Sequence, residues 1–508
     1  MAAGDGCRVD PDTSAGVPGY DPALSNADLL PVPEEKRTWN TWNIAALWVG
    51  MAITIPTYTL ASSLVDGGWT WQAAVGSVVL GNFIVLIPIA LISHAGTRYG
   101  IPFPVLTRAS FGVFGANVPA ILRAIVACGW FGIQTWIGGF AIFKMTEALW
   151  PGIASLPLVI PSWVGIGTGE FLCFMLFWAI NLWIALRGMN SIKFLETWGS
   201  PFLIAVGLLL FAWAWYRAGG LGPMLQNPAP TAGQRTGITA VFGAGLTSAV
   251  AFWGTMALSI PDFSRYARSQ RDQVLGQALG LPVTMGVFAF IGATVTAATL
   301  VIFGTRVSDP VELLSRVGGP VTVVVAMLGL TIATLTTNIA ANVVAPANGF
   351  SNAAPSRISF RSGVVITAVI GILMMPWKLY NDAAAYIFTW LIGYGALLGP
   401  IAGIMIADYF VLRRGRLELD ALYHRTGEYS YTRGVNWVAM VALALGVAPN
   451  LPGFLGGLGV IQAAPWATTV YDWAWFVGFA VAAATYLGGM TVMGGYRNRE
   501  AEVGYAGD

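Results

Sequence analysis

Apolar and polar positions alternate along this chain on the scale of whole helices. Apolar runs of about 20 residues, the length that a helix needs to cross a hydrocarbon core of about 30 Å, recur along most of the sequence. Short polar segments separate them. We predict twelve membrane-spanning helices, near residues 44–65, 73–93, 115–143, 162–186, 198–216, 239–261, 276–303, 319–346, 363–377, 383–407, 436–456 and 471–493.

Two of these spans contain helix breakers in corresponding places. Gly50 and Pro56 interrupt the first span, and Gly254 and Pro261 interrupt the sixth. A proline cannot donate to the carbonyl group four residues earlier, so a helix bends or ends near it. Interrupted spans at matching positions of two halves are typical of transporters built from inverted repeats, with the binding site at mid-membrane. The alternative, for either span alone, is that such residues are simply tolerated in a membrane helix.

Composition and charge support an integral membrane protein and orient it. The 508 residues are 56% hydrophobic and 10% charged, against about 25% charged in a soluble domain. With both termini in the cytoplasm, 19 Lys and Arg residues fall in inside segments and five in outside segments, as the positive-inside rule requires. The expected divisions are a cytoplasmic tail (1–42), a first inverted repeat (43–217), a second (218–410), a cytoplasmic loop (411–435), two final spans (436–494) and a cytoplasmic tail (495–508).

The inventory of reactive side chains argues against an enzyme. Cys7, Cys128 and Cys173 have no metal-site or disulfide spacing, and the polar first 37 residues do not resemble a cleavable signal peptide. At membrane depth the chain offers few titratable groups, chiefly Arg123 and Glu170. We therefore expect no organic cofactor, no nucleic-acid partner and no obligatory protein partner. Neutral polar groups and aromatic rings suit the binding of a small, mostly uncharged solute.

The segment ATLTTNIAAN, residues 333–342, is unusually polar for a membrane helix. Thr334, Asn338 and Asn342 are spaced by four residues and form one stripe, whereas Thr336 and Thr337 lie on neighbouring faces. Polar groups in a membrane helix must face protein or a cavity rather than lipid. The alternative for each threonine is a hydrogen bond to the carbonyl group four residues earlier. Asparagine has no such simple local solution.

The segment CGWFGIQTW predicts a site for a planar ligand. Trp130 and Gln134 are four residues apart, so they lie on one face of a helix. An indole offers a flat stacking surface, and a carboxamide offers a donor and an acceptor beside it. Together they fit a planar heterocycle with adjacent N–H and C=O groups.

Several longer motifs carry a family resemblance. They are LLPVPEEKRTWNTWNIAALWVGM, RYGIPFPVLTRASFG, CGWFGIQTWIGG, IPDFSRYARSQ, ATLTTNIAANVVAPANG and GPIAGIMIADYFVLRRGRL, in this order. This pattern resembles the nucleobase-cation symporter-1 family of hydantoin, allantoin, uracil and cytosine permeases. The resemblance implies an all-α membrane protein with a leucine-transporter-like fold, in which two inverted five-helix repeats precede two C-terminal helices. It also implies cation-coupled uptake of a heterocycle or ureide across the cell membrane.

The resemblance assigns substrate contacts to Trp130, Gln134, Trp253 and Asn342. Asn338 is left open between a second ligand and a residue that holds helices together. A hydantoin-transporting member has glutamine and glycine at the positions of Thr54 and Phe252 here. We expect both to line or adjoin the pocket, so a preference for hydantoins does not transfer.

The resemblance also implies a cation site between the first and eighth spans. Its expected ligands are the carbonyl groups of Gly50, Ile53 and Ala333 and the hydroxyl groups of Thr336 and Thr337. Sodium and protons are both open as coupling ions. Glu170 is the candidate proton carrier, with a structural carboxyl group as the alternative. An uncoupled facilitator or channel for the same solutes is the alternative function.

Overall fold

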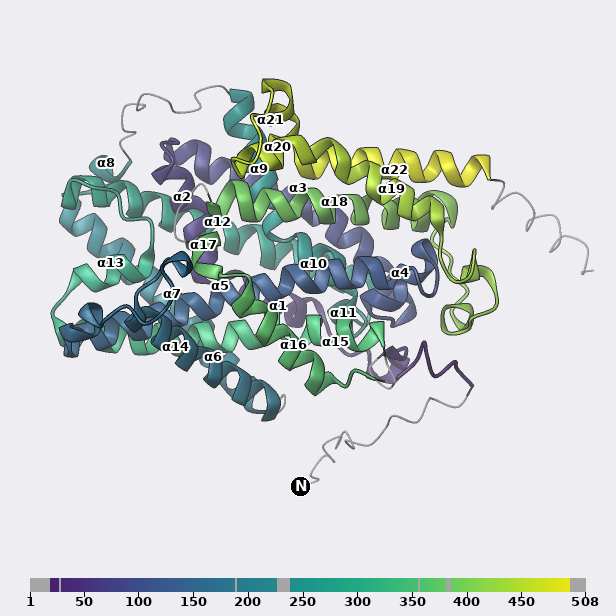
Figure 1. Cartoon of the computed structure of the whole chain (residues 1–508), viewed down its shortest axis with the longest axis horizontal. Coiled ribbons are helices and arrows are strands. Elements are labelled where there is room, and N and C mark those ends of the chain that lie inside the picture. Colours follow the sequence, from purple (N-terminus) through teal and green to yellow (C-terminus); the bar gives the residue numbers. More distant parts are fainter. Residues whose placement is uncertain are drawn as a thin grey trace, which may run out of the picture.

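A computed structural model describes residues 19–26, 29–187, 190–225, 238–354, 357–380 and 385–493 of the chain. These ranges form helices joined by turns, with only isolated bridges of β type. Most long helices run along one axis (Figure 1). The long helices are α3 (Trp71–Tyr99), α5 (Asn117–Leu149), α6 (Thr168–Arg187), α7 (Asn190–Ala218), α12 (Gln270–Phe303), α14 (Pro320–Asn342), α18 (Ile392–Ile406) and α22 (Ala474–Val492).

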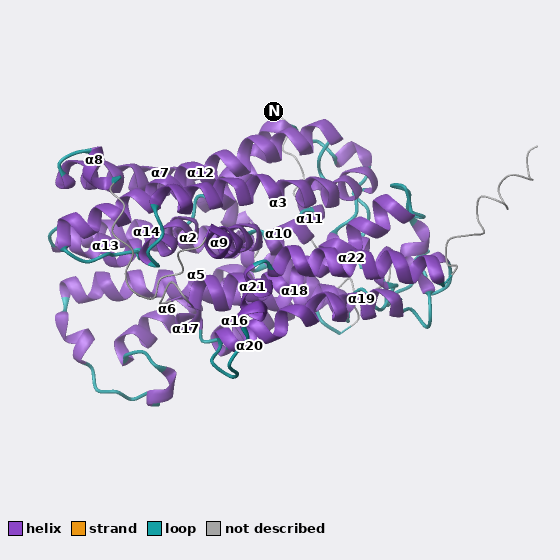
Figure 2. Cartoon of the chain, turned by 90° about the horizontal axis from the view of Figure 1, so that it is seen from above, coloured by secondary structure: helices purple, strands orange, loops and turns teal. Residues whose placement is uncertain are grey.

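Shorter helices lie along the bundle and at its two ends. The end that carries α8 and α13 lies opposite the end that carries α4 (Figure 1), and α8 and α13 again lie together at one end in the view from above (Figure 2). We call them the α13 end and the α4 end. The shorter helices are α4 (Phe103–Phe111), α8 (Leu221–Met224), α13 (Pro310–Val317), α15 (Val344–Ala353), α16 (Phe360–Leu373), α17 (Pro376–Tyr380), α19 (Trp437–Val447), α20 (Leu451–Gly457) and α21 (Pro465–Asp472).

The lengths of these helices make the chain a multi-pass membrane protein. Among the described residues, nine helical segments are long and apolar enough to cross a membrane, or eleven if each of two bent pairs counts as one span. The predicted ninth span corresponds to α16, an apolar helix of 14 residues, shorter than the roughly 20 residues of an untilted span. The count of twelve spans therefore stays a prediction.

The first bent pair confirms the predicted break in the first span and moves its centre. Helix α1 (Thr41–Ala52) and helix α2 (Ile55–Asp66) meet at 55°. The chain leaves helical geometry at Ile53 and Thr54, where Thr54 is extended with φ −140° and ψ 160°. Pro56 sits in the first turn of α2, where a missing N–H costs no helical hydrogen bond. The proline thus marks the start of the second half rather than the middle of the break.

The second bent pair confirms the break in the sixth span. Helices α9 (Ile238–Phe252) and α10 (Gly254–Ser259) meet at Trp253, and the pair is bent by 44°. Pro261 opens the next short helix, α11 (Pro261–Ser264), again in the first turn. Both breaks fall between two helical segments of one span, so backbone groups are released from the helical pattern inside the bundle.

Helix α12 packs closely against both halves of the first broken span. A Cβ atom added at Gly276 would lie 2.7 Å from the carbonyl oxygen of Thr41, and Gly280 approaches α1 equally closely. One added at Gly292 would lie 2.5 Å from the carbonyl oxygen of Tyr58 in α2. Only glycine fits at these positions without backbone movement, so α1, α2 and α12 are in backbone-to-backbone contact.

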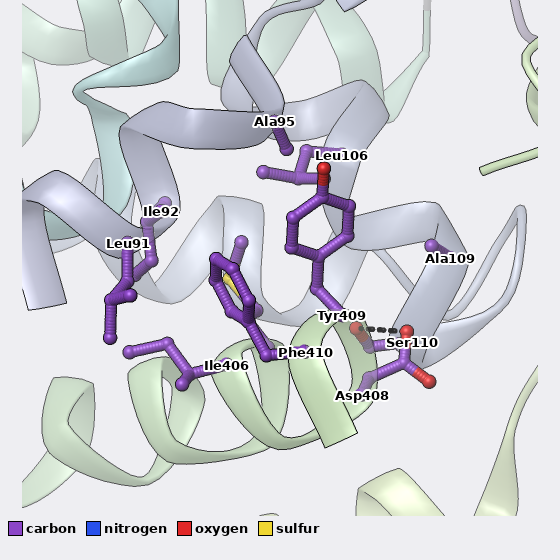
Figure 3. Close-up of a pocket in the computed structure, with 11 residues that line it drawn as sticks. Leu91, Ile92, Ala95, Leu106, Ala109, Ser110, Ile406, Asp408, Tyr409 and Phe410 are labelled. Carbon is purple, nitrogen blue, oxygen red and sulfur yellow. Dashed lines mark hydrogen bonds between the residues drawn. The ribbon is translucent and has the colours of Figure 1, made fainter. Parts of the chain in front are cut away.

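The α4 end is held by a buried ion pair. Arg413 Nε lies 2.7 Å from Asp408 Oδ2, and both side chains are buried. Asp408 belongs to η6 (Ala407–Leu412), a π-helical continuation of α18, and accepts a hydrogen bond from Ser110 of α4 at 3.1 Å. Figure 3 shows this contact beside a small cavity of about 10 Å³ between α3, α4 and η6. Arg413 also donates to the carbonyl oxygen of Ala109 at 2.9 Å, so one guanidinium joins α4 to the end of α18.

The fourth span starts later than predicted, which moves Glu170. Helix α6 begins at Thr168 rather than near residue 162, because the preceding segment contains Gly165 with a positive φ of 85°. Glu170 therefore lies in the first turn, where its Oε2 accepts a hydrogen bond from the Gly167 N–H at 2.8 Å. The placement of Glu170 well inside a span is wrong. The structure shows a carboxylate at a helix amino terminus, where the helix dipole favours it.

Candidate functional site

The two helix breaks face α5 and α14 across a small cavity of about 50 Å³. This cavity brings together residues from four parts of the chain that are far apart in the sequence. The cavity is lined by Met51, Thr54, Pro56, Trp130, Gln134, Phe252, Trp253, Thr255, Met256, Thr337, Ala341 and Asn342. We expected seven residues at the substrate pocket. Six of them line this cavity, and Asn338 does not.

Two carboxamide groups in the cavity wall retain hydrogen-bonding capacity. Gln134 of α5 is buried, and its side chain has no hydrogen-bond partner among the described residues. Asn342 of α14 donates through Nδ2 to Asn338 but accepts no hydrogen bond at Oδ1 from the described residues. Buried polar groups are seldom left unpaired, so these groups indicate a place for a polar ligand or for water. Between them they offer both donors and acceptors.

Aromatic rings form one side of the cavity. The ring centroid of Phe252 lies 5.2 Å from that of Trp130 and 5.2 Å from that of Trp253, edge-to-face in both cases. Phe252 thus stands between the two indoles that we expected to stack on the ligand. The buried Nε1 of Trp253 has no hydrogen-bond partner among the described residues. Any flat ligand between Trp130 and Trp253 must also fit against the edge of Phe252.

The segment at the start of the tenth span covers Trp130. This segment is η5 (Ala385–Leu391), a π-helical turn that leads into α18. Trp390 and Tyr394 lie edge-on to Trp130, with ring centroids 5.9 Å and 6.3 Å away. Tyr386 donates through its hydroxyl group to the carbonyl oxygen of Pro56 at 3.2 Å, next to the first break. The tenth span is therefore in direct contact with both the aromatic wall and the broken first span.

Thr54 serves the local fold as well as the cavity. Its Oγ1 accepts a hydrogen bond from the N–H of Thr57 at 3.4 Å and lies 3.1 Å from the hydroxyl oxygen of Thr57. The side chain thereby caps the amino terminus of α2, a position that favours Ser, Thr, Asp or Asn. The cavity wall at this point is a hydroxyl group that is already engaged.

Asn338 lies behind the cavity rather than in its wall. It is fully buried, and its Nδ2 lies within hydrogen-bonding distance of the Phe131 carbonyl oxygen (3.3 Å), Thr135 Oγ1 (3.1 Å) and Asn181 Oδ1 (3.2 Å). Its Oδ1 accepts from Asn342. We left open whether Asn338 is a second substrate ligand or a residue that holds helices together. The geometry favours the second role.

The expected cation ligands lie where α1 approaches α14. Gly50 is in the last turn of α1 and Ile53 is the residue that ends it. On α14, the Thr337 hydroxyl donates to the carbonyl oxygen of Ala333 at 3.1 Å, so these two oxygen atoms lie side by side. The side chain of Thr336 lies outside the described part of the chain. The described oxygens are neutral, a donor set that suits a hard monovalent cation.

Arg123 stabilises the broken sixth span from the side of α5. This buried guanidinium donates through Nη2 to Ser259 Oγ at 2.5 Å and through Nε to the carbonyl oxygen of Thr255 at 3.5 Å. Arg123 thus donates to one hydroxyl group and one carbonyl group of α10. Its role in the structure is to hold α10 against α5.

Several cavity residues were missed by the sequence analysis. Met51, Pro56, Thr255 and Met256 flank the two breaks, and Ala341 precedes Asn342 on α14. Their only signal in the sequence is proximity to a predicted break or to a predicted ligand. Asn181 was also missed, although an asparagine in the apolar run WAINLW is itself unusual at membrane depth.

The chain has many similarities to known proteins. The model of a family described as permease for cytosine/purines, uracil, thiamine and allantoin matches residues 31–478. The chain is 45% identical over 473 residues to the purine-uracil permease NCS1 of Arabidopsis thaliana, which covers 92% of this chain and 78% of that protein. It is 40% identical over 470 residues to the allantoin permease of Bacillus subtilis, covering 91% and 92% of the two chains.

A solved structure extends the similarity to three dimensions. Mhp1, a nucleobase-cation-symport-1 family transporter solved in a closed conformation with bromovinylhydantoin bound, superposes with a TM-score of 0.75 at 26% identity. The match covers 94% of this chain and 98% of Mhp1. The leucine-transporter-like fold that the sequence motifs implied is thereby confirmed, and the similar proteins are permeases rather than enzymes.

Proposed function

The chain belongs to the family of permeases for cytosine/purines, uracil, thiamine and allantoin, and from this premise we propose that it is a cation-coupled symporter. Its substrate is a nucleobase or a related heterocycle or ureide of the uracil, allantoin or hydantoin class. It carries this substrate into the cell by alternating access. Both termini lie in the cytoplasm, and the protein resides in the cell membrane.

One observation carries the choice of substrate. The cavity places the unpaired carboxamide of Gln134 and the unpaired Oδ1 of Asn342 beside an aromatic wall that includes Trp130. Planar rings gain from stacking on an indole, and adjacent N–H and C=O groups satisfy carboxamides. Because the wall provides no charged side chain among its lining residues, the ligand is neutral.

The proposed coupling rests on where α1 breaks. The carbonyl groups of Gly50 and Ile53 lie at the end of α1, close to α14, which carries Ala333 and Thr337. Thr337 also lines the cavity. A cation held by these oxygens orders the break next to the substrate, so each ligand raises the affinity for the other.

Uptake into proteoliposomes tests this function directly. Radiolabelled uracil, allantoin and hydantoin are offered to vesicles with an imposed sodium gradient, with an imposed proton gradient, and with neither. We expect one gradient to drive accumulation of at least one solute above its outside concentration. Vesicles that contain the Trp130→Ala variant serve as the control, since that variant loses the stacking surface. If none of the three solutes enters the vesicles, either by accumulation or by equilibration, the proposed substrate class is rejected.

An uncoupled facilitator is the second candidate, favoured by a specific contact. In this structure the Thr337 hydroxyl is engaged with the Ala333 carbonyl of its own helix, as a threonine without a cation role would be. A facilitator equilibrates its solute at a rate that no gradient changes. Equilibration without accumulation in the same vesicles would establish this alternative and reject symport.

A further inference from the structure

Three buried asparagine side chains form a continuous hydrogen-bonded chain that leads from the cavity to α6. Asn342 Nδ2 donates to Asn338 Oδ1 at 3.1 Å, and Asn338 Nδ2 donates to Asn181 Oδ1 at 3.2 Å. Asn181 Nδ2 then donates to the carbonyl oxygen of Phe177 at 2.8 Å. We call these three residues the asparagine relay. It crosses from α14 to the neighbouring α6 (Figure 1).

The direction of the relay is set at its far end. A carboxamide has a donor end and an acceptor end of nearly the same shape, so its neighbours decide which way it points. The Phe177 carbonyl group accepts hydrogen bonds and donates none. Asn181 must therefore turn its NH₂ group toward Phe177 and its oxygen toward Asn338.

Asn338 has a second anchor of the same polarity. Its Nδ2 lies 3.3 Å from the Phe131 carbonyl oxygen and 3.1 Å from Thr135 Oγ1. The Thr135 hydroxyl already donates to the Phe131 carbonyl at 2.7 Å, so its oxygen is left to accept. Three acceptors thus surround the NH₂ group of Asn338. Its oxygen can only point to Asn342.

We infer that Asn338, supported by Asn181, is a positioning residue that makes Asn342 present its oxygen, and not its NH₂ group, to the substrate. Asn342 turns its NH₂ group toward Asn338 and uses one N–H there, so its Oδ1, which accepts no hydrogen bond from the described residues, is the acceptor that it offers to the cavity. The ligand must then bring an N–H group to Asn342. This inference rests on the proposed function, since it specifies how that substrate site reads its ligand.

Methylation of a ring nitrogen converts the N–H group that the ligand must bring to Asn342 into an apolar group, so methylated ligands test the inference. The probes are uracil and uracil methylated at either ring nitrogen, with hydantoin and its N-methyl forms as a second series. Binding is measured by calorimetry on the purified full chain. We expect at least one methylated form to bind about tenfold or more weakly than its parent, because the methyl group leaves the buried Oδ1 of Asn342 without a donor.

Variants of the relay separate positioning from simple support of the fold. Asn338→Leu frees Asn342 to turn, so the affinity ratio between parent and methylated ligand falls toward one. Asn181→Leu lowers the same ratio by a smaller factor, because the Phe131 carbonyl still orients Asn338. The matched control is Asn82→Leu in α3, a buried asparagine that donates to its own Val78 carbonyl at 2.7 Å and lies outside the cavity wall. It leaves the ratio unchanged.

The outcomes distinguish this inference from the proposed function. If the relay only supports the fold, Asn338→Leu and Asn181→Leu lower stability but keep the ratio of the unaltered protein, and the inference is overturned. If Asn338→Leu does not fold, the comparison of Asn181→Leu with Asn82→Leu decides. Failure of the unaltered protein to bind any parent ligand would reject the proposed substrate class, and the inference with it.

Discussion

The hydroxyl group of Thr337 donates to the carbonyl oxygen of Ala333 at 3.1 Å, one turn earlier on α14. Both atoms are expected ligands of the coupling cation. A cation at this point attracts both oxygens, so the hydroxyl proton must turn away from Ala333 when the ion binds. The contact therefore describes two ligands already held next to each other, at the cost of one internal hydrogen bond.

Replacing Thr337 with alanine should weaken the response to sodium. We expect the sodium concentration that half-saturates substrate binding to rise about tenfold, within the usual range of coupling between two sites. Thr331→Ala is the matched control, because Thr331 makes the same bond, to the Met327 carbonyl at 2.7 Å, on the same helix. Thr337→Ser should keep most of the normal response to sodium, because serine retains the hydroxyl group. An unchanged response in Thr337→Ala would remove this residue from the cation site.

Phe252 should limit the size of the ligand. It lies edge-on to both Trp130 and Trp253 and fills space between them. Phe252→Ala should therefore increase the affinity for a hydantoin with a bulky ring substituent relative to that for uracil, by roughly tenfold or more. Competition binding measures this ratio. Phe140→Ala, which removes a ring stacked on Trp136 away from the cavity, controls for loss of packing. Equal ratios in the two variants would contradict the role given to Phe252.

Asp309 should make stability depend on pH at the α13 end. Its Oδ1 caps α13 by accepting from the Val311 N–H at 2.7 Å, and burial raises its pKa to about 6. This pKa exceeds the value of about 3.9 for a free aspartate, so the folded protein holds the proton more tightly than the unfolded chain. The stability contributed by Asp309 is full below about pH 4 and is lost as the pH rises through about 6.

Asp309→Asn keeps the cap but removes this titration. Thermal unfolding should show the variant gaining stability over the unaltered protein as the pH rises from about 4 to 7, then no further gain. Glu312→Gln should change the pH dependence of stability in the opposite direction. Burial raises the pKa of Glu312, but Lys144 and Arg316 outweigh this and leave the pKa lowered, so its contribution is lost as the pH falls. Parallel pH profiles for both variants would refute the assignment.

The Asp408–Arg413 pair should be essential for stability at the α4 end. Arg413→Met leaves the buried Asp408 carboxylate without its cation, which costs about 3–5 kcal/mol. Arg316→Met, which breaks a partly exposed pair with Glu312, should cost only about 0–1 kcal/mol. Denaturant titration in mixed micelles compares the two free energies of unfolding. Similar losses in both variants would show that the buried pair is not special.

The broken helices show what a sequence pattern can locate. Gly50 and Pro56 identified the correct span and lie on either side of its break. They did not locate the break at Ile53 and Thr54, because a proline is best accommodated after a break, in the first turn of the next helix. The same reasoning applies to Pro261, which opens α11 several residues beyond the bend at Trp253.

The site shows which contacts a sequence leaves undetermined. The four-residue spacings correctly placed Trp130 with Gln134, and Asn338 with Asn342, on shared helix faces. They gave no information about the partner across the helix interface, so the contact between Asn338 and Asn181 appeared only in the structure. Glu170 was misplaced for a related reason, since hydropathy did not show that the turn at Gly165 delays the start of α6.

The glycine contacts of α12 join both halves of the first span to a single helix. Gly276 and Gly280 let α12 pack directly against α1, and Gly292 lets it pack directly against α2. One continuous helix therefore contacts both sides of the break. The two halves then have no freedom to swing separately at Ile53 and Thr54 while α12 stays straight. The angle of 55° between α1 and α2 is thus fixed by one neighbouring helix that packs against both of them.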